Sequence, residues 1–247
     1  MTGLRRAAFA GAFLAAASTG AVVADEVPEG ASVYVGVTTN SLFRGVSQTT
    51  DQDFYHRDGM SAMTGNKHST ATTTTATDDE MFAPALYGGI DYLHGSGLYA
   101  SVYATSIDIP GFDAFARVDG SAGYLHRFDS GWRIDGGAVV YAYPGETGSN
   151  FWEVYAGAGF GPVSGKIWYD PVNDNSYIQG RLNFDMGSDL QLNLTAGHYS
   201  LDTGPDYEDY GVWISKAFGS LTVGGGVADT SLDSAIIYMY LSYRFPL

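Results

Sequence analysis

Apolar and polar residues alternate with a period of two along most of the chain. Residues 177–186 alternate Tyr, Gln, Arg, Asn and Asp with Ile, Gly, Leu, Phe and Met, and residues 190–196 repeat this alternation after a Gly187-Ser188 turn. Successive side chains of a strand point to opposite faces of its sheet. The two segments therefore predict a β-hairpin with one apolar and one polar face.

The same alternation predicts about twelve strands. Each segment has roughly 8–14 residues, close to the 9–11 that a tilted membrane-spanning strand needs. The first begins at Val33, where Val33, Val35, Val37 and Phe43 are interleaved with polar positions that end at Arg44. The predicted strands cover 33–44, 82–93, 97–107, 114–127, 131–143, 151–160, 163–170, 177–186, 190–196, 210–218, 220–229 and 235–245.

Short and long links alternate strictly between these segments. The short links are 94–97, 129–131, 161–165, 187–189 and 219–220, and the long ones are 46–81, 108–113, 144–150, 171–176, 200–209 and 229–234. Outer-membrane barrels have short periplasmic turns and longer external loops. We therefore predict an all-β fold, a single antiparallel transmembrane β-barrel of about twelve strands with both termini on the periplasmic side.

Aromatic residues near the predicted strand ends favour interfacial girdles of the kind that flank a membrane barrel. They are Trp132, Trp152, Phe160, Trp168, Trp213, Tyr243 and Phe245. Alternation alone does not say which face points outward, so a soluble up-and-down barrel with an apolar interior stays open as an alternative.

The first 24 residues are typical of a secretory signal peptide. Arg5 and Arg6 precede the Ala-rich apolar stretch 7–17, and small residues at 22–24 offer a cleavage site. The stretch is too short for a membrane anchor, which needs roughly 20 residues. We predict cleavage after residue 24 and a barrel domain over 25–247 in the bacterial outer membrane.

Composition and charge exclude several classes of protein. The 247 residues are 45% hydrophobic, which argues against disorder, and they contain no cysteine for disulfides or thiolate metal sites. The formal charge of −15 argues against nucleic-acid binding, and removal of Arg5 and Arg6 with the leader takes it to −17. The 33 glycines and 18 tyrosines suggest many short strands joined by tight turns.

Residues 51–80 interrupt the alternation. They include the run Thr72–Thr75, His56, His68 and an acidic end. This composition predicts a low-complexity external loop, with a plug inside the barrel as the alternative. The spacing of the two histidines fits no familiar metal site, so we expect no metal and no other cofactor.

The segment Ser41-Leu-Phe-Arg-Gly-Val-Ser-Gln-Thr49 closely resembles a motif of the TorF family of porins. Similar segments follow in order at 88–100, 141–145, 153–157 and 209–219, so the resemblance covers nearly all of the chain beyond the leader except 51–80. It implies a small outer-membrane barrel of porin type, inserted by the barrel assembly machinery, with no established substrate. The Thr-rich insertion and the ending Phe245-Pro246-Leu247 depart from the expected pattern.

If the apolar face meets lipid, strand parity assigns charged side chains to the lumen. The pore-lining candidates are Arg44, Asp91, Arg117, Asp119, Arg133, Asp135, Glu153, Lys166, Asp170, Arg181 and Asp185. Such groups either close into ion pairs that fill the interior or flank a hydrated path whose selectivity they set. Arg44 is the first candidate for a constriction, and a salt bridge to the barrel wall is its structural alternative.

Acidic residues gather at the predicted external links. They are Asp51, Asp53, Asp78, Asp79, Glu80, Asp108, Glu146, Asp174, Asp202, Asp206, Glu208 and Asp209. A negative rim concentrates cations, so we predict a weak cation preference. The alternative roles of these acids are solubility and divalent-cation bridging to lipopolysaccharide, a predicted partner together with the outer-membrane lipids.

We predict no enzymatic activity. His198 and Ser200 share one strand face, but residues two apart lie about 6.5–7 Å from each other, which is too far for a nucleophile–base pair. The function predicted is passive diffusion of small hydrophilic solutes or ions through an outer-membrane pore. The alternatives are a closed barrel acting as a surface receptor or adhesin, and a soluble carrier of an apolar ligand.

Overall fold

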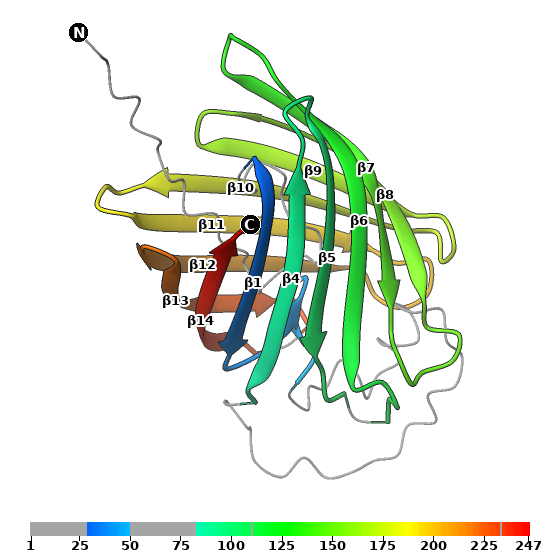
Figure 1. Ribbon diagram of the computed structural model, residues 1–247. Coiled ribbons are helices and arrows are strands. Elements are labelled where there is room, and N and C mark those ends of the chain that lie inside the picture. Colours follow the sequence, from blue (N-terminus) through cyan, green and yellow to red (C-terminus); the bar gives the residue numbers. More distant parts are fainter. Residues whose placement is uncertain (1–28, 50–82, 110, 233) are drawn as a thin grey trace, which may run out of the picture.

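A computed structural model describes residues 29–49, 83–109, 111–232 and 234–247 of this chain (Figure 1). The predicted signal peptide and the Thr-rich segment 51–80 lie outside the described residues. The barrel strands are β1 (Gly30–Thr38), β4 (Ala85–Leu93), β5 (Leu98–Ser106), β6 (Ala116–Arg127), β7 (Trp132–Ala142), β8 (Phe151–Phe160), β9 (Val163–Asp170), β10 (Asn175–Asp185), β11 (Leu190–Ser200), β12 (Tyr207–Phe218), β13 (Leu221–Thr230) and β14 (Ile236–Pro246).

These strands form one closed antiparallel barrel, as predicted. Each pairs with its neighbour in the chain, and β1 closes the barrel by pairing with both β4 and β14. Ser32 lies opposite Pro246 at the closure. A closed barrel satisfies the backbone hydrogen bonds of all its strands and leaves no exposed sheet edge.

The two ends of the barrel differ in the length of their links. At one end, two to four residues connect β4 to β5, β6 to β7, β8 to β9, β10 to β11 and β12 to β13. At the other end, four to nine residues connect β5 to β6, β7 to β8, β9 to β10, β11 to β12 and β13 to β14 (Figure 1). We call these the short-link end and the long-link end. The predicted alternation of links is therefore confirmed except at β9–β10, where β10 begins at Asn175 and the link has four residues, as many as the β10–β11 link.

Alternation along the strands separates an apolar outside from a polar inside. In β10, Tyr177, Gln179 and Arg181 are buried in the lumen, whereas Ile178 is 55% exposed on the outer face. The exposed set includes Val35, Leu86, Ile90, Val102, Val140, Val154, Ile167, Val212, Ile214, Val227, Ile237 and Leu241. This is the opposite of a soluble barrel with an apolar interior, and it overturns the soluble-carrier alternative.

The prediction that seven aromatic residues form interfacial girdles is right for five of them and wrong for two. Trp132, Trp152, Phe160, Tyr243 and Phe245 are exposed on the outer surface, as expected of girdle residues. The other two, Trp168 and Trp213, are buried inside the barrel, because each shares its parity with the lumenal positions of β9 and β12.

The first predicted strand is too long. β1 ends at Thr38, and the chain then turns into the barrel to form a small hairpin of β2 (Leu42–Phe43) and β3 (Val46–Ser47). All residues from 40 to 48 are buried. The prediction that Arg44 lies at the end of a wall strand is therefore wrong. Arg44 lies at the tip of this lumenal hairpin.

Local chemistry explains why the chain turns at this point. Arg44 and Gly45 have φ values of 49° and 81°, the positive values at both tip positions that a type I′ hairpin turn needs. At the base of the lumenal hairpin, the Gln48 amide donates to the Ser41 carbonyl at 2.7 Å. The Ser47 hydroxyl donates to the Asn40 side-chain oxygen, also at 2.7 Å.

Tyrosines on the lumenal wall lie over glycines on the neighbouring strand. Tyr99 is directly opposite Gly123, and a Cβ built on Gly123 would lie 2.5 Å from the Tyr99 hydroxyl oxygen. The other pairs of this kind are Tyr34 with Gly89, Tyr87 with Gly36, Tyr155 with Gly137 and Tyr240 with Gly224. Glycine is needed here because a ring occupies the place of its missing side chain.

We expect Gly123→Ala to lower the free energy of unfolding by about 1–3 kcal/mol, since overpacking a well-filled interior costs that much. The added Cβ would also lie 2.6 Å from the Gly136 carbonyl oxygen, which is backbone and cannot swing away. Urea unfolding of the barrel in detergent micelles measures the change.

The matched control is Gly120→Ala on the same strand, where a Cβ would meet no atom within 4 Å. Equal stability losses in the two variants would contradict the steric explanation.

Candidate functional site: the barrel lumen

The tip of the lumenal hairpin carries a buried ion pair. The Arg44 Nη2 atom is 2.6 Å from both carboxylate oxygens of Glu153 on β8. The Tyr141 hydroxyl donates to the same carboxylate at 2.9 Å. The side chains of Arg44 and Glu153 are only 1% and 0% exposed. The structural alternative considered for Arg44, a salt bridge to the wall, is thus the arrangement found.

Aromatic rings surround the Arg44 guanidinium. Its carbon lies 4.4 Å from the ring centres of Tyr177 and Tyr199, 4.9 Å from that of Phe43 and 6.0 Å from that of Trp168. Rings at these distances attract a cation through their negative faces. Burial lowers the pKa of Arg44, but the charge of and hydrogen bond to Glu153, together with Tyr199 and Tyr141, outweigh it, and the pKa lies well above its ordinary value. The guanidinium therefore stays charged.

A second ion pair holds the return segment of the lumenal hairpin. Arg117 on β6 donates through Nε to Asp119 at 3.0 Å and through Nη1 to the Gln48 side-chain oxygen at 2.5 Å. The Gln48 carbonyl accepts from the Asp108 amide at 2.8 Å. The hairpin base is consequently fixed to the β5–β6 side of the barrel.

The hairpin tip reaches the opposite wall. A Cβ on Gly45 would lie 2.8 Å from both the Asp209 Cβ on β12 and the Thr230 Cγ2 on β13. Since the base is held by β6 and Arg44 by β8, the lumenal hairpin crosses the bore near its long-link end. The aromatic cluster around it, which includes Phe43, Tyr141, Tyr143, Phe151, Tyr199 and Tyr207, fills the space between hairpin and wall.

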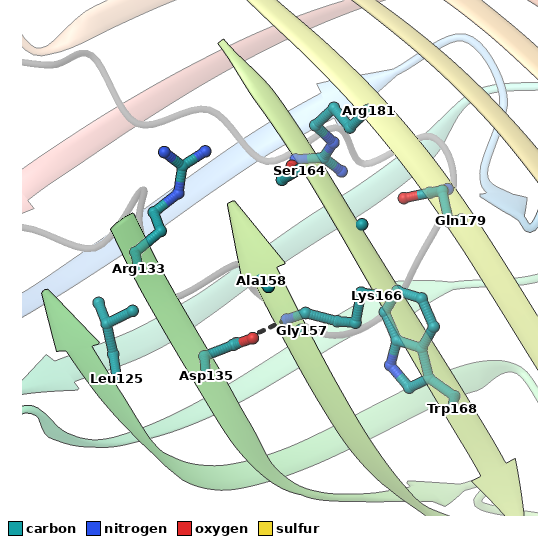
Figure 2. A pocket seen from close by; sticks show the side chains of 11 residues that line it. Leu125, Arg133, Asp135, Gly157, Ala158, Ser164, Lys166, Trp168, Gln179 and Arg181 are labelled. Atoms are coloured by element: carbon teal, nitrogen blue, oxygen red, sulfur yellow. Dashed lines mark hydrogen bonds and ion pairs between the residues drawn. The ribbon is translucent and has the colours of Figure 1, made fainter. Parts of the chain in front are cut away.

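Toward the short-link end the lumen is less filled. The lumenal positions of β8 change from Phe151, Glu153 and Tyr155 to Gly157 and Gly159. A cavity of about 30 Å³ opens there. Its lining, drawn in Figure 2, comprises Leu125, Arg133, Asp135, Gly157, Ala158, Ser164, Gly165, Lys166, Trp168, Gln179 and Arg181.

Two predicted candidates form an ion pair in this cavity. The Lys166 Nζ is 2.7 Å from an Asp135 carboxylate oxygen, and Figure 2 shows the two side chains meeting across β8. The Tyr99 hydroxyl donates to the same oxygen at 3.4 Å. Arg133 donates to the Gly161 carbonyl at 3.1 Å, and the Arg181 guanidinium lies 5.7 Å from the Trp213 ring centre.

The remaining candidates lie elsewhere. Asp91 is buried at the barrel closure and accepts from Arg244 at 3.0 Å and from Ser101 at 2.7 Å. Asp170 faces inward but accepts from the amides of Val172 and Asn173, so it shapes the β9–β10 link. Asp185, in contrast, is exposed and accepts from the Gly187 amide at the short-link rim.

Sequence reasoning missed three polar residues of the lumen. The sequence pattern puts Gln48 in a long link and Asp209 in the external rim, and it does not assign Arg244 to the lumen. In the structure, Asp209 is 1% exposed and accepts from the Tyr177 hydroxyl at 2.7 Å. The odd parity of Asp209, Gly211 and Trp213 on β12 was a signal that could have found it.

His198 on the outer face of β11 lies 3.4 Å from a Glu208 carboxylate oxygen, and both side chains are nearly half exposed. Among the described residues, no three His, Asp or Glu side chains gather as metal ligands would. The described part of the chain also has no helix with the length and hydropathy to cross a membrane.

A model of the family described as "Bacterial protein of unknown function (Gcw_chp)" matches residues 74–243. No curated protein matches the chain. Among solved structures, it is similar to a KdgM porin, with a TM-score of 0.55 and 9% identity over 87% of this chain and 99% of that chain. A NanC porin aligns with a TM-score of 0.54 and 9% identity, over 88% and 100%. At these identities the likeness shows a shared barrel fold.

A double-mutant cycle tests the ion pair at the hairpin tip. We expect Arg44→Met and Glu153→Leu each to lower the free energy of unfolding by about 3–5 kcal/mol, because each leaves a buried charge without its partner. The double variant should lose less free energy of unfolding than the two single variants lose together. Urea unfolding in micelles measures the free energy of unfolding of all three variants.

Lys216 provides the control, since it lies on the outer face of β12. Combining Lys216→Met with Glu153→Leu should give additive losses. Additive losses in the Arg44 cycle as well would show that the two groups are not energetically coupled.

Proposed function

The chain belongs to the Gcw_chp family of bacterial proteins, and we propose that its barrel is an outer-membrane channel. Small hydrophilic solutes or ions would diffuse passively through it, without covalent chemistry or a cofactor. The observation that carries this proposal is the combination of an apolar outer surface and a charged lumen in one closed barrel. The resemblance to TorF-family porins supports the same function.

The outer surface supports a place in a membrane. Large apolar side chains are exposed on the outer faces of every barrel strand except β11, whose outward leucines are partly exposed, and this is far more than a soluble monomer tolerates. A belt of this kind matches the lipid-facing band of outer-membrane barrels. The expected partners are outer-membrane lipids, lipopolysaccharide and the barrel assembly machinery.

The lumenal hairpin would set the rate of passage. It crosses the bore at the long-link end, which we place outside the cell, and its ion pairs hold it there. A path through this half would run beside the hairpin and the charged wall, so that only small solutes pass. The tight filling around Arg44 also favours the second candidate function, a closed barrel that acts as a surface receptor or adhesin.

A weak cation preference would arise at the long-link end. The links there carry Asp108, Asp113, Glu146, Asp174, Asp202 and Asp206. Among the described residues, the single Lys or Arg in these links is the buried Arg44. An acidic rim raises the local concentration of cations, which favours their entry.

Planar-bilayer recording under a KCl gradient tests both the pore and its selectivity. We expect discrete current steps and a reversal potential of the sign set by potassium. The preference should weaken as salt rises, because the Debye length falls from about 30 Å at 0.01 M to about 3 Å at 1 M. A reversal potential favouring chloride would contradict the cation preference, and silence from folded, inserted protein would favour the receptor.

The variant Arg44→Ser, measured in the same recordings, tests whether the lumenal hairpin limits the current. Loss of the ion pair with Glu153 should release the lumenal hairpin from the wall and raise the unit conductance. Lys216→Ser removes the same charge from the outer surface and should leave the conductance unchanged. Equal conductance in the Arg44 variant and the original protein would show that the hairpin does not limit flow.

A further inference from the structure

We propose that a hollow at the short-link rim, between the β4–β5 turn and the end of β6, binds the phosphoethanolamine headgroup of a phospholipid. The hollow has a volume of about 440 Å³, and its lining includes Glu29, His94, Ser96, Tyr124 and His126. Small-molecule sites have volumes of roughly 300–1,000 Å³, so a lipid headgroup fits this space. The inference rests on the proposed function in one respect, because it needs the barrel to lie in a membrane.

Unequal hairpin lengths create the hollow. The link between β4 and β5 covers only residues 94–97, and the Leu125 amide of β6 donates to the Gly97 carbonyl of this link at 2.9 Å. β6 continues beyond that hydrogen bond to Arg127, and the β6–β7 hairpin projects past the β4–β5 turn (Figure 1). The top of the turn and the projecting end of β6 thus form two sides of the hollow.

The β4–β5 turn fixes which nitrogen of His94 carries the ring proton. The Ser96 amide donates to His94 Nδ1 at 3.1 Å, and the Ser96 hydroxyl oxygen lies 2.8 Å from the same atom. A backbone amide can only donate, so Nδ1 is an acceptor and the proton is on Nε2. His94 can therefore offer an N–H from Nε2 to a phosphate oxygen in the hollow.

Aromatic rings hold the imidazole of His126 at the β6 side of the hollow. It stacks on Tyr124, with 6.3 Å between the ring centres and 14° between the planes. It also contacts Phe128 in a T-shaped arrangement, with the ring centres 4.4 Å apart. These contacts fix the plane of the imidazole, whose N–H is the second donor facing the hollow. Hydrogen bonds to an ionised phosphate are stronger than those between neutral groups.

Glu29 supplies a charge that selects among phospholipids. Its carboxylate lies over the β4–β5 turn, because a Cβ on Gly95 would be 2.7 Å from the Glu29 Oε1 atom. This carboxylate repels a headgroup that carries only negative charge. Phosphoethanolamine carries an ammonium group beside its phosphate, so the ammonium can meet Glu29 while the phosphate meets the two imidazoles.

The outer wall beside the hollow suits the rest of a lipid molecule. Tyr92 and Tyr124 are 47% and 45% exposed on the outer face. Between them on β5 lie Leu98, opposite Tyr124, and Ala100, opposite Tyr92, over which an acyl chain can run. Tyrosines exposed on a membrane barrel mark the level of the lipid headgroups. The hollow therefore lies at the level where a lipid on this wall has its headgroup.

The imidazole signals of the histidine-labelled barrel report on this site in dodecyl maltoside micelles, whose headgroups are uncharged. The chain has 5 histidines, and the variants His94→Gln and His126→Phe assign two signals by their disappearance. Titration with dihexanoyl-phosphatidylethanolamine should shift the His94 and His126 signals to saturation. The signal of His198, near the long-link end of β11, should not move. The proposal is overturned if the lipid shifts neither His94 nor His126 in the folded barrel.

A matched pair of variants separates the site from a general effect of histidine. His126→Phe keeps an aromatic ring between Tyr124 and Phe128 but removes the ring nitrogens. It should weaken lipid binding, followed on the His94 signal, about tenfold or more, the loss typical of a hydrogen bond to a charged group. His198→Phe should leave binding unchanged. Equal weakening in the two variants would contradict the assigned site.

Two further probes test the headgroup and the source of the phosphate. Dihexanoyl-phosphatidylglycerol lacks the ammonium and should bind more weakly than the phosphatidylethanolamine, and Glu29→Gln should remove this preference. Free phosphoethanolamine has no acyl chains and should also bind more weakly than the lipid. Equal binding of the two lipids to the original protein, or equal binding of free phosphoethanolamine and the lipid, would overturn the proposal.

Lipid binding and conductance are measured separately, so the two proposals can fail separately. A saturable shift of the His94 and His126 signals in a barrel that carries no current would support the lipid site without the channel. Current without any shift on addition of lipid would support the channel and overturn the lipid site.

Discussion

A guanidinium group placed inside a barrel needs a counter-charge, and the arrangement of this lumen depends on how Arg44 obtains one. Its partner is Glu153 on β8, on the wall that faces the hairpin tip. A twelve-stranded barrel is wider than the eight-stranded barrels that wall side chains fill by themselves, so a segment must enter the bore to close it. The Arg44–Glu153 pair holds this segment in place, and the rings of Tyr177 and Tyr199 then pack against a charge that is already neutralised.

The lumen consequently has two unlike halves. Near the long links, bulky rings and paired charges meet the lumenal hairpin, and the exposed links are acidic. Near the short links, glycines on β8 leave space that Arg133, Lys166 and Arg181 surround. The difference originates in the size of successive lumenal residues on one strand, from Phe151 to Gly159. From the long links to the short ones, the lumen therefore changes from a tight aromatic section around the hairpin to a more open section beside the β8 glycines.

The wall of the barrel could be predicted from alternation, because each face of a strand meets a uniform environment. Alternation could not distinguish a wall strand from a hairpin of two-residue strands, so Phe43 and Arg44 were assigned to the wall. Alternation also does not reveal which charged side chains form ion pairs with one another. Arg244 and Asp91 lie on β14 and β4, which come together on either side of β1 only when the barrel closes. Parity places Trp213 and Asp209 in the lumen, where the structure has them, whereas their proximity to the ends of a strand points to the interface and the rim.

The tyrosines that lie over cross-strand glycines bear on how the strands find their correct partners. A slip of one residue is penalised at once, because it turns apolar side chains inward and polar ones outward. A slip of two residues keeps every side chain on its proper face, and the alternation alone would not resist it. Such a slip would move Tyr99 away from Gly123 and Tyr155 away from Gly137, so each ring would meet a residue with a side chain of its own. These pairs therefore disfavour the two-residue misalignments that hydrophobic patterning alone does not penalise.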